Sequence, residues 1–429
     1  MPNRVLFFFY LLLLLGCSSK ETLIWQKGNI HTHTLWSDGD APPETVVNWY
    51  KENNYQFLAL SDHNILSEGE KWIPVVDEED SSKWPPPFSL EKLNKLKKEF
   101  GDDWPELRYV GDTLQMRLKT LKELKDYFEV PGKFILIPSE EITDAFEKKP
   151  VHINAINIQT LLHPQGGESV LDVMQRNLDA ILHQRQETGQ PILAHVNHPN
   201  FGWGIVAEDL MQLTGDPFFE VYNGHPGVNN WGDDAHPGTD RMWDIILTNR
   251  LHTNKNLFYG VATDDSHAYY DFGVGKSNTG RGWVMVKSNA LTPSSIVRAL
   301  EKGDFYSSTG VTIDNIKLSN NNFSIQIQPE NDVRFMTQFI GTLKDFDPKA
   351  TPIVNDEDFP SHVAHVYSQD IGRVLYETSE NPANFIIPDD VLYVRAKILS
   401  TKKHPNPFSK GDAEMAWVQP VVRPSKKNQ

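Results

Sequence analysis

The sequence predicts an α/β protein with a parallel sheet, a helical insertion and a smaller all-β part. Three observations predict this organisation. Short apolar runs alternate with helical patterns through residues 28–312, the stretch from about 70 to 130 interrupts that alternation, and short alternating runs fill residues 313–429. Strands that alternate with helices are typical of a parallel sheet with helices packed on it.

Six apolar runs have the length of buried strands, and most of them end in a polar residue. They are QFLALS (56–61), KFILIPS (133–139), VHINAINI (151–158), PILAHVN (191–197), FFEVYN (218–223) and LFYGVAT (257–263).

Helical patterns lie between several of these runs. Segment 42–54 begins with two prolines, and segment 168–188 is followed by Gly189, the residue type that most often ends a helix. Segment 291–303 opens with a threonine and a proline and closes with a glycine, which is the usual asymmetry of helix ends. We expect a helix in each of the three.

Residues 70–130 form the predicted helical insertion over one end of the main domain. The spacer KWPPPF (83–88) is rigid and extended because of its prolines. SLEKLNKLKKEF (89–100) and TLKELKDYF (120–128) have amphipathic helical patterns, and the second opens with a capping box.

The pattern of apolar and polar residues changes beyond Gly310. Runs such as NFSIQIQ (322–328) and LYVRAKIL (392–399) alternate between apolar and polar residues and are separated by Asn, Pro and Asp clusters. This pattern predicts a small all-β domain after a boundary near residue 312.

The chain is acidic, with 57 Asp and Glu against 41 Lys and Arg and a formal net charge of −16. A protein that binds nucleic acid through its phosphates needs a basic face. We therefore expect no nucleic-acid partner, although an acidic chain can still contain a local basic pocket.

The N-terminal segment 1–17 has the pattern of a bacterial lipoprotein signal peptide. Arg4 is followed by an unbroken apolar run from Val5 to Leu15. As a helix this run spans about 16 Å, roughly half of a bilayer core, so it is too short for a stable membrane span. The run ends in LLGC, which resembles a lipobox, so Cys17 is expected to carry a lipid and to anchor the chain outside the cytoplasm of a bacterial cell. Cys17 is the only cysteine, so an intrachain disulfide cannot form.

Two histidines stand at the start of the folded region, in GNIHTHTLWSDGD (28–40). In a strand, side chains at i and i+2 point to the same face, so His31 and His33 would project together. Neutral imidazole is a ligand for Zn, Mn or Fe. One such pair is weak evidence on its own.

The same kind of residue recurs at other strand ends. The motifs are ALSDHN (59–64) with Asp62 and His63, SEEIT (139–143) with Glu140 and Glu141, VHINAI (151–156) with His152, HVNHPN (195–200) with His195 and His198, and TDDSH (263–267) with Asp264, Asp265 and His267. In parallel α/β proteins, the carboxyl ends of the strands are where sites are built. Their agreement predicts a metal centre.

In this order, the motifs resemble the PHP (polymerase and histidinol phosphatase) superfamily of metal-dependent hydrolases, over residues 28–312. FFEVYNG, GRGWVMVK and GDFYSSTG further resemble its CehA/McbA-type branch. The resemblance implies a distorted (β/α)7 barrel with two or three divalent metal ions, Mn, Zn or Fe, at the strand ends.

The resemblance also implies a ligand set. His31, His33 and Asp265 would hold one metal, and Glu141 would bridge it to a second metal that His152 and His198 complete. Asp38, His63 and His267 would hold a third. Glu141, Asp265 and His267 would therefore be central to catalysis. Glu140 remains an alternative to Glu141, and His195 remains an alternative to His198.

Other polar residues have more modest predicted roles. Arg281 is a candidate for clamping a substrate phosphate with its planar guanidinium, and His225 is a candidate proton donor to the leaving group. Glu220 is expected to support a ligand rather than bind metal. Seven histidines are expected not to be ligands: His163, His183, His236, His252, His362, His365 and His404.

The resulting hypothesis is a metal-dependent hydrolase that activates water, with a small phosphate ester as its substrate. A hydrolase of carbamates, esters or amides is the second hypothesis, because the same activated water serves both reactions. A cell-surface binding module that keeps the metals without turnover is the third.

Overall fold

The structure is a computed structural model that describes residues 23–78, 83, 85–215, 218–353 and 364–424. The predicted signal segment with Cys17, as well as His362, lies outside these residues. Within them, no helix combines the length and the apolar character that a membrane crossing needs.

The helices begin and end close to the places that the sequence predicts. In chain order they are α1 (Pro43–Glu52), α2 (Leu90–Phe100), α3 (Leu121–Phe128), α4 (Val170–Thr188), α5 (Ala207–Leu210), α6 (Thr239–His252) and α7 (Pro293–Glu301). Thr120 and Glu123 form the predicted capping box before α3. The Thr292 side chain caps α7, and Gly189 ends α4 in the left-handed conformation, with φ of 67°. α5 and α6 were not predicted.

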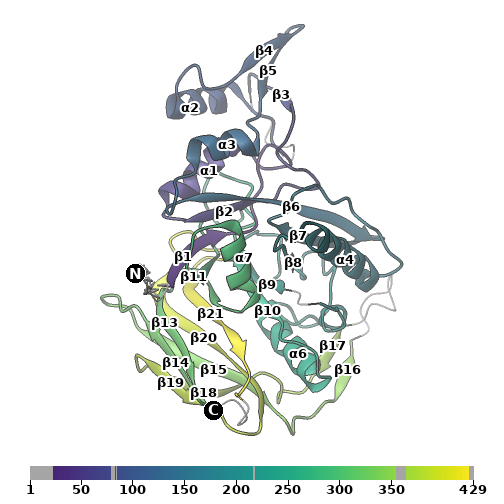
Figure 1. The fold of residues 1–429 in the computed structure, drawn as a ribbon, viewed down its shortest axis with the longest axis vertical. Coiled ribbons are helices and arrows are strands. Elements are labelled where there is room, and N and C mark those ends of the chain that lie inside the picture. Colours follow the sequence, from purple (N-terminus) through teal and green to yellow (C-terminus); the bar gives the residue numbers. More distant parts are fainter. Residues whose placement is uncertain (1–22, 79–82, 84, 216–217, 354–363, 425–429) are drawn as a thin grey trace, which may run out of the picture.

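Most of the strands belong to one large sheet. In chain order the strands are β1 (Ile24–Asn29), β2 (Phe57–Leu60), β3 (Trp72–Pro74), β4 (Leu107–Val110), β5 (Thr113–Arg117), β6 (Ile135–Phe146), β7 (Lys149–Ile156), β8 (Leu193–Val196), β9 (Phe218–Asn223), β10 (Tyr259–Thr263), β11 (Trp283–Ser288), β12 (Phe305–Ser308), β13 (Ile313–Ser319), β14 (Asn322–Ile327), β15 (Phe335–Leu343), β16 (Ala350–Pro352), β17 (His365–Tyr367), β18 (Arg373–Thr378), β19 (Ala383–Ile386), β20 (Val391–Lys403) and β21 (Ala413–Val421). Thirteen of them form a sheet in the order β10-β9-β8-β7-β6-β2-β1-β11-β12-β21-β20-β15-β18 (Figure 1).

The prediction of a parallel sheet is correct only in part. β1, β2 and β6 run parallel, as do β8, β9 and β10. β7, however, is antiparallel to both of its neighbours, and β11 is antiparallel to β1. Only Glu147 and Lys148 join β6 to β7. Two residues suffice for a hairpin, whereas a parallel pair needs a crossover of a dozen residues or more.

The sheet curls, so that its β10 edge approaches strands from its other half. Gly260 of β10 donates its N–H to Gln419 of β21 at 3.1 Å and accepts from the same side chain at 2.8 Å. Ser307 of β12 also donates to the Gly260 carbonyl oxygen, at 2.9 Å. Side-chain hydrogen bonds, and not a main-chain ladder, therefore connect β10 to β12 and β21. The fold is of the mixed α/β class.

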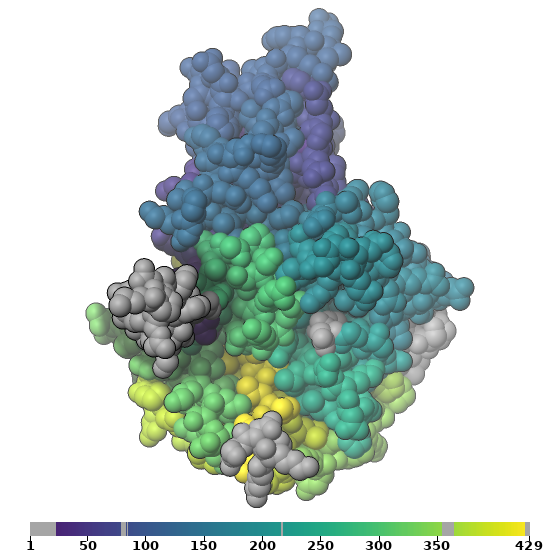
Figure 2. All heavy atoms as spheres, in the orientation of Figure 1, coloured from purple at the N-terminus to yellow at the C-terminus, as the bar shows by residue number. Residues whose placement is uncertain are grey.

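The insertion contains both helices and strands, whereas the sequence predicted helices alone. α2 and α3 are present, but residues 72–117 also form a three-stranded antiparallel sheet in the order β3-β5-β4. Figure 2 shows this part projecting from the rest of the molecule. Its apolar side packs on the loop that follows β1, through Leu35 and Trp36. The insertion therefore supports the loop that carries Asp38.

The C-terminal region is rich in β-strands, and its sheet is continuous with that of the preceding part. β21 pairs with β12 across the predicted boundary near residue 312. A separate sheet, β13-β14-β19, packs with β15 and β20 around a core that contains Phe323, Phe339 and Ile398. A buried ion pair between Arg395 of β20 and Asp244 of α6, at 2.7 Å, joins this region to the helix layer.

One apolar cluster fills the inside of the curled sheet. It contains residues from strands of the sheet together with α7, including Phe57 of β2, Ile137 of β6, Leu193 of β8, Val261 of β10 and Val284 of β11. All five side chains are 2 % exposed or less. This buried cluster lies below the carboxyl ends of the strands, where the predicted ligands lie.

Candidate metal centre

The two leading histidines follow β1 directly and are held by main-chain contacts to the loop after β10. His33 N–H donates to the Ser266 carbonyl oxygen at 3.1 Å, and Asp265 N–H donates to the His31 carbonyl oxygen at 3.1 Å. Thr32 and Ser266 form a parallel bridge between the two segments. The HTH and DDSH motifs, more than 200 residues apart in sequence, thereby form one rigid unit.

The structure brings all nine predicted ligands together. They form four groups whose ligand atoms lie within 4.8 Å of one another. These groups are His33, Asp38, His63 and His267; His31, His33 and Asp265; His31, Glu141 and His198; and His63, Glu141 and His152. The groups share members, so the nine side chains make one continuous cluster of a kind that suits more than one metal ion.

Glu141 lies at the centre of the cluster. Its Oε2 faces nitrogens of His31, His33 and His63 at 3.4, 3.2 and 2.9 Å. Its Oε1 faces His152 Nδ1 at 3.0 Å and His198 Nε2 at 3.4 Å. Both oxygens are thus placed between sets of imidazoles, which is the arrangement that a bridging carboxylate requires.

Glu140 points to the other face of β6, because neighbouring residues of a strand alternate. Its Oε1 accepts a hydrogen bond from Leu162 N–H at 2.7 Å. Burial raises the pKa of Glu140 to about 8. The geometry therefore favours Glu141 over Glu140 as the ligand.

The geometry likewise favours His198 over His195 as the ligand. His195 is fully buried in β8, its Nε2–H reaches the Ile30 carbonyl oxygen at 3.4 Å, and burial lowers its pKa to about 4. His198, past the end of the strand, belongs to one of the four groups. It has a φ of 22° and Asp265 has a φ of 47°. Such conformations are strained for residues other than glycine and often occur at functional sites.

The third predicted group lies on the open side of the cluster. Asp38 Oδ1 faces His267 Nε2 at 3.3 Å, and Asp38 Oδ2 faces His63 Nε2 at 3.6 Å. The side chains of Asp38 and His63 are each 26 % exposed, whereas those of His31, His33 and Glu141 are 0 % exposed. A substrate would therefore reach the centre past Asp38 and His63.

Glu220 orients His31, in the supporting role that the sequence predicts. His31 Nδ1–H donates to Glu220 Oε1 at 2.6 Å, which leaves Nε2 to face the cluster. Glu220 also accepts from Thr263 Oγ1–H at 2.7 Å and from His198 N–H at 2.7 Å. Burial raises the pKa of Glu220, but the neighbouring His31 outweighs it and the pKa falls to about 2. A carboxylate behind a ligating histidine is the usual support of a metal site.

Three further supporting residues were given no role from the sequence, although Asp62 is among the polar residues noted there at strand ends. Asn197 donates to Glu141 Oε1 at 2.7 Å, and Asn223 donates to Asp265 Oδ2 at 3.1 Å. Asp62 accepts from Thr34 N–H at 2.8 Å and from the Ser37 hydroxyl at 2.7 Å, which fixes the loop that carries Asp38. All three stand at strand ends, so the strand-end position that identified the ligands is also their sequence signal.

Arg281 is not placed to clamp a phosphate. It is fully buried, and its guanidinium donates to the carbonyl oxygens of Gly224, Gly273 and Lys276. These contacts fix the loops around the centre, and they argue against the predicted substrate contact.

His225, by contrast, lies beside the cluster, with its ring centroid 5.3 Å from that of His267. Its Nδ1 accepts from Gly227 N–H at 3.0 Å, so its proton is on Nε2. Burial lowers its pKa to about 4. His225 thus remains available as a neutral hydrogen-bond donor.

Six of the seven histidines that were expected not to be ligands are described, and none of the six belongs to a metal group within the described ranges. Three of them pair with acidic side chains elsewhere, namely His183 with Glu187, His236 with Asp233 and His365 with Glu208.

The donor set fits divalent metal ions. It combines imidazole nitrogens with carboxylates and contains no thiolate, which suits Mn, Fe or Zn. Glu141 Oε2 is buried and, in the part of the chain that the structure describes, accepts no hydrogen bond. A buried carboxylate oxygen without such a partner is costly, and a cation between it and the surrounding imidazoles would satisfy it.

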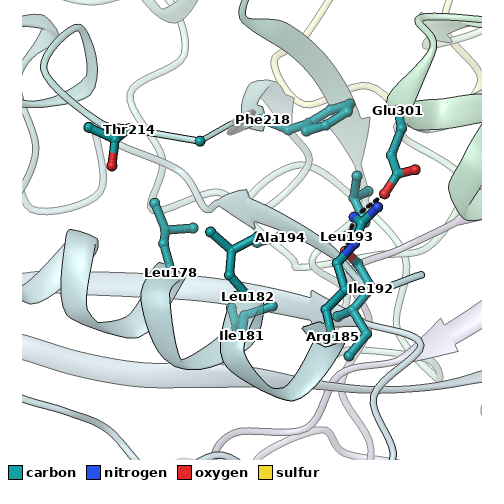
Figure 3. A pocket seen from close by; sticks show the side chains of 11 residues that line it. Leu178, Ile181, Leu182, Arg185, Ile192, Leu193, Ala194, Thr214, Phe218 and Glu301 are labelled. Atoms are coloured by element: carbon teal, nitrogen blue, oxygen red, sulfur yellow. Dashed lines mark hydrogen bonds and ion pairs between the residues drawn. The ribbon is translucent and has the colours of Figure 1, made fainter. Parts of the chain in front are cut away.

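A pocket of about 220 Å³ lies away from this centre, between α4, β8, β9 and α7 (Figure 3). Leu193 and Phe218, which line it, stand at the first residues of β8 and β9. The predicted ligands stand near the other ends of these strands. The ion pair between Arg185 and Glu301 lies at the edge of this pocket.

No family model and no curated protein matches the chain. Among solved structures, a two-domain protein of Bacteroides vulgatus that contains a predicted PHP-like metal-dependent phosphoesterase is 13 % identical, with a TM-score of 0.38, over 93 % of this chain and 96 % of that one. A candidate metal-dependent phosphoesterase of Bifidobacterium adolescentis is 14 % identical, with a TM-score of 0.28, over 59 % and 90 %. An amidohydrolase of Chromobacterium violaceum, solved with sulfate and no metal, is 11 % identical, with a TM-score of 0.26, over 57 % and 88 %. These values are too low to assign an activity to this chain.

We expect Glu220→Gln to weaken metal binding by roughly 10–100-fold, the usual cost of losing a carboxylate behind a ligating histidine. The amide keeps the size of the side chain but loses the negative charge that faces His31. Titration of the metal-free protein with Zn²⁺ or Mn²⁺ measures the effect. Glu208→Gln is the matched control, because Glu208 pairs with His365. An unchanged affinity in Glu220→Gln would contradict the assigned role.

Proposed function

We propose that the protein is a metal-dependent hydrolase whose cluster holds two or three divalent ions, Mn, Zn or Fe. The observation that carries this proposal is the position of Glu141, whose two oxygens face five imidazoles of the shared groups. Such ions lower the pKa of a water and offset negative charge on the scissile group. We also propose that β1, β2 and β6 to β11 form the distorted (β/α)7 barrel implied by the resemblance.

The chain's own residues would divide the remaining tasks. Glu220 fixes the tautomer of His31, and Asn223 fixes Asp265. Access past Asp38 and His63 determines where the substrate enters. His225, with its proton on Nε2, would donate a hydrogen bond to a leaving group as a neutral imidazole, which is a smaller role than the proton donor that the sequence predicts.

A small phosphate ester is the proposed substrate, because a cluster of cations matches the charge of a phosphoryl group. A carbamate, ester or amide is the second candidate. The observation that favours it is that the Arg281 guanidinium already donates to backbone carbonyl oxygens. Dedicated recognition of a phosphate often uses an arginine whose guanidinium faces the ligand.

The test is hydrolysis by the metal-loaded protein of three substrate panels: phosphomonoesters, phosphodiesters and carbamates. Turnover of a phosphate panel supports the first candidate, and turnover of carbamates alone supports the second. Metal-loaded protein that binds these compounds and hydrolyses none would indicate a binding module and would contradict the proposed function.

We also propose that the chain is anchored to a bacterial cell membrane, outside the cytoplasm, by a lipid on Cys17. Cys17→Ser removes the only thiol that could carry the lipid. The variant is therefore expected to move from the membrane fraction to the soluble fraction, as measured by fractionation and immunoblotting. Membrane association that persists in Cys17→Ser would indicate an uncleaved signal anchor instead.

A further inference from the structure

Exposed apolar side chains gather where the described chain begins. Leu23 and Ile24 are 51 % and 52 % exposed, Val422 is 44 % exposed and Leu318 is 36 % exposed. Leu318 and Val422 line a cleft with Trp25, the residue that follows Ile24, so residues far apart in sequence share one surface. Trp25 of β1 donates its Nε1–H to the Asp314 carbonyl oxygen of β13 at 2.9 Å, so the two strands that contribute Trp25 and Leu318 lie side by side (Figure 1). We call Trp25, Leu318 and Val422, which line this cleft together, the N-terminal face.

Charged residues border this face. Lys287, Lys302 and Asp304 line the same cleft, and Lys287 Nζ lies 5.3 Å from the centre of the Trp25 ring. Lysine side chains can lay their stems along an apolar surface while their ammonium groups reach polar headgroups. A grouped set of exposed apolar residues with lysines beside it is typical of a surface that contacts a partner.

The proposed lipid determines which partner is near. Five residues, 18–22, separate Cys17 from Leu23, and a fully extended chain of five residues spans at most roughly 18 Å. A lipid on Cys17 would therefore hold the N-terminal face close to the bilayer. A lipid tether alone leaves the protein free to tilt on the bilayer. An apolar face next to the tether favours the one orientation in which that face contacts the bilayer.

The metal centre lies at the other end of the same strand. β1 runs from Ile24 to Asn29, and His31 and His33 follow it. A strand of this length spans about 20 Å. The open side of the cluster, at Asp38 and His63, is therefore separated from the N-terminal face by the length of the sheet.

We propose that the N-terminal face rests on the anchoring bilayer and that the metal centre opens away from it. The substrate is then a water-soluble molecule taken from the aqueous phase, and a lipid of the same bilayer is excluded by position. This inference rests on the proposed lipid at Cys17 and on the proposed hydrolase function for its statement about substrates.

The orientation can be measured with a matched pair of labelled variants, Val422→Cys on the N-terminal face and Val274→Cys in the loop after His267. Val274 is 56 % exposed. Once a lipid occupies the thiol of Cys17, the introduced cysteine is the only free thiol, because the chain has no other. Each acylated, fluorophore-labelled protein is placed in vesicles of phosphatidylethanolamine and phosphatidylglycerol that contain a lipid with a nitroxide headgroup.

The expected result is several-fold stronger quenching by the nitroxide lipid at position 422 than at position 274. Adding Leu318→Asp to both proteins is expected to reduce the difference, because it places a charge on the face. Equal quenching at the two positions, stronger quenching at 274, no effect of Leu318→Asp or a mature chain without lipid would each overturn the inference.

This readout does not depend on activity. A protein with the expected quenching but no hydrolysis would keep the orientation and overturn the proposed function. A hydrolase with equal quenching would do the reverse.

Discussion

Glu141→Gln is expected to remove metal from the centre, and Glu140→Gln is expected to leave it in place. The wild-type chain, grown with Mn or Zn, should contain at least two transition-metal ions. Glu141 faces five imidazoles, so its loss affects more than one ion at once. The fall in affinity should exceed the roughly 10–100-fold that follows from losing a supporting residue. Elemental analysis of both variants after equal metal loading provides the measurement.

Glu140 is a matched control because it is the same residue type on the same strand, with its side chain on the other face. Its Oε1 accepts a hydrogen bond from Leu162 N–H, so Glu140→Gln changes a structural contact. More metal lost from Glu140→Gln than from Glu141→Gln would show that the bridge is wrongly assigned. Wild-type protein with less than one ion per chain would contradict the metal centre itself.

Most of the candidate ligands could be recognised from sequence because they follow or lie in apolar runs, whereas Asp38 and the grouping of the ligands into sites came from the family resemblance. The preference for Glu141 and His198 over their neighbours also came from that resemblance, because the apolar runs alone do not show which face of a strand meets the cluster. In β6 the register pairs Glu141 with Asn154 and Glu140 with Ala155, a long-range fact that the local sequence does not contain. Arg281 shows the same limit, since its partner Gly224 lies in the loop after β9 and its partner Gly273 lies eight residues away in its own loop.

The fold was predictable to a similar depth. Helices with clear end signals, such as α3, α4 and α7, were found. α6 was missed because it is buried around most of its circumference, from Met242 to Thr248, and so lacks a polar face that alternates with an apolar one. The short strands β3 to β5 were missed because β4 is exposed and β3 and β5 are mostly half-buried, so Met116 is the one buried residue among the three. Exposed strands carry little apolar periodicity.

Asp265→Asn is expected to lower kcat by roughly 10²–10³-fold or more, the range for losing one preorganised electrostatic contact to a transition state. Asp265 Oδ1 faces His31 Nε2 and His33 Nε2, each at 3.2 Å. Asparagine keeps the shape of the side chain but removes the charge that helps to hold a cation there. KM should change much less, because metal ions held at this site would act mainly on the transition state. Steady-state kinetics on the substrate found in the panels measures the effect, and His267→Ala should show the same division between kcat and KM.

Asp264→Asn provides the control within the same motif. Asp264 accepts hydrogen bonds from the N–H groups of Gly280, Arg281 and Gly282 at 2.9, 2.6 and 2.8 Å, so it fixes a loop and does not belong to any of the four groups. Its replacement should lower the free energy of unfolding while metal content and kcat stay near the wild-type values. Two neighbouring aspartates would then separate catalysis from scaffolding. Unaltered turnover in both Asp265→Asn and His267→Ala would exclude this cluster as the catalytic centre, because no reaction that depends on it could tolerate the loss of either ligand.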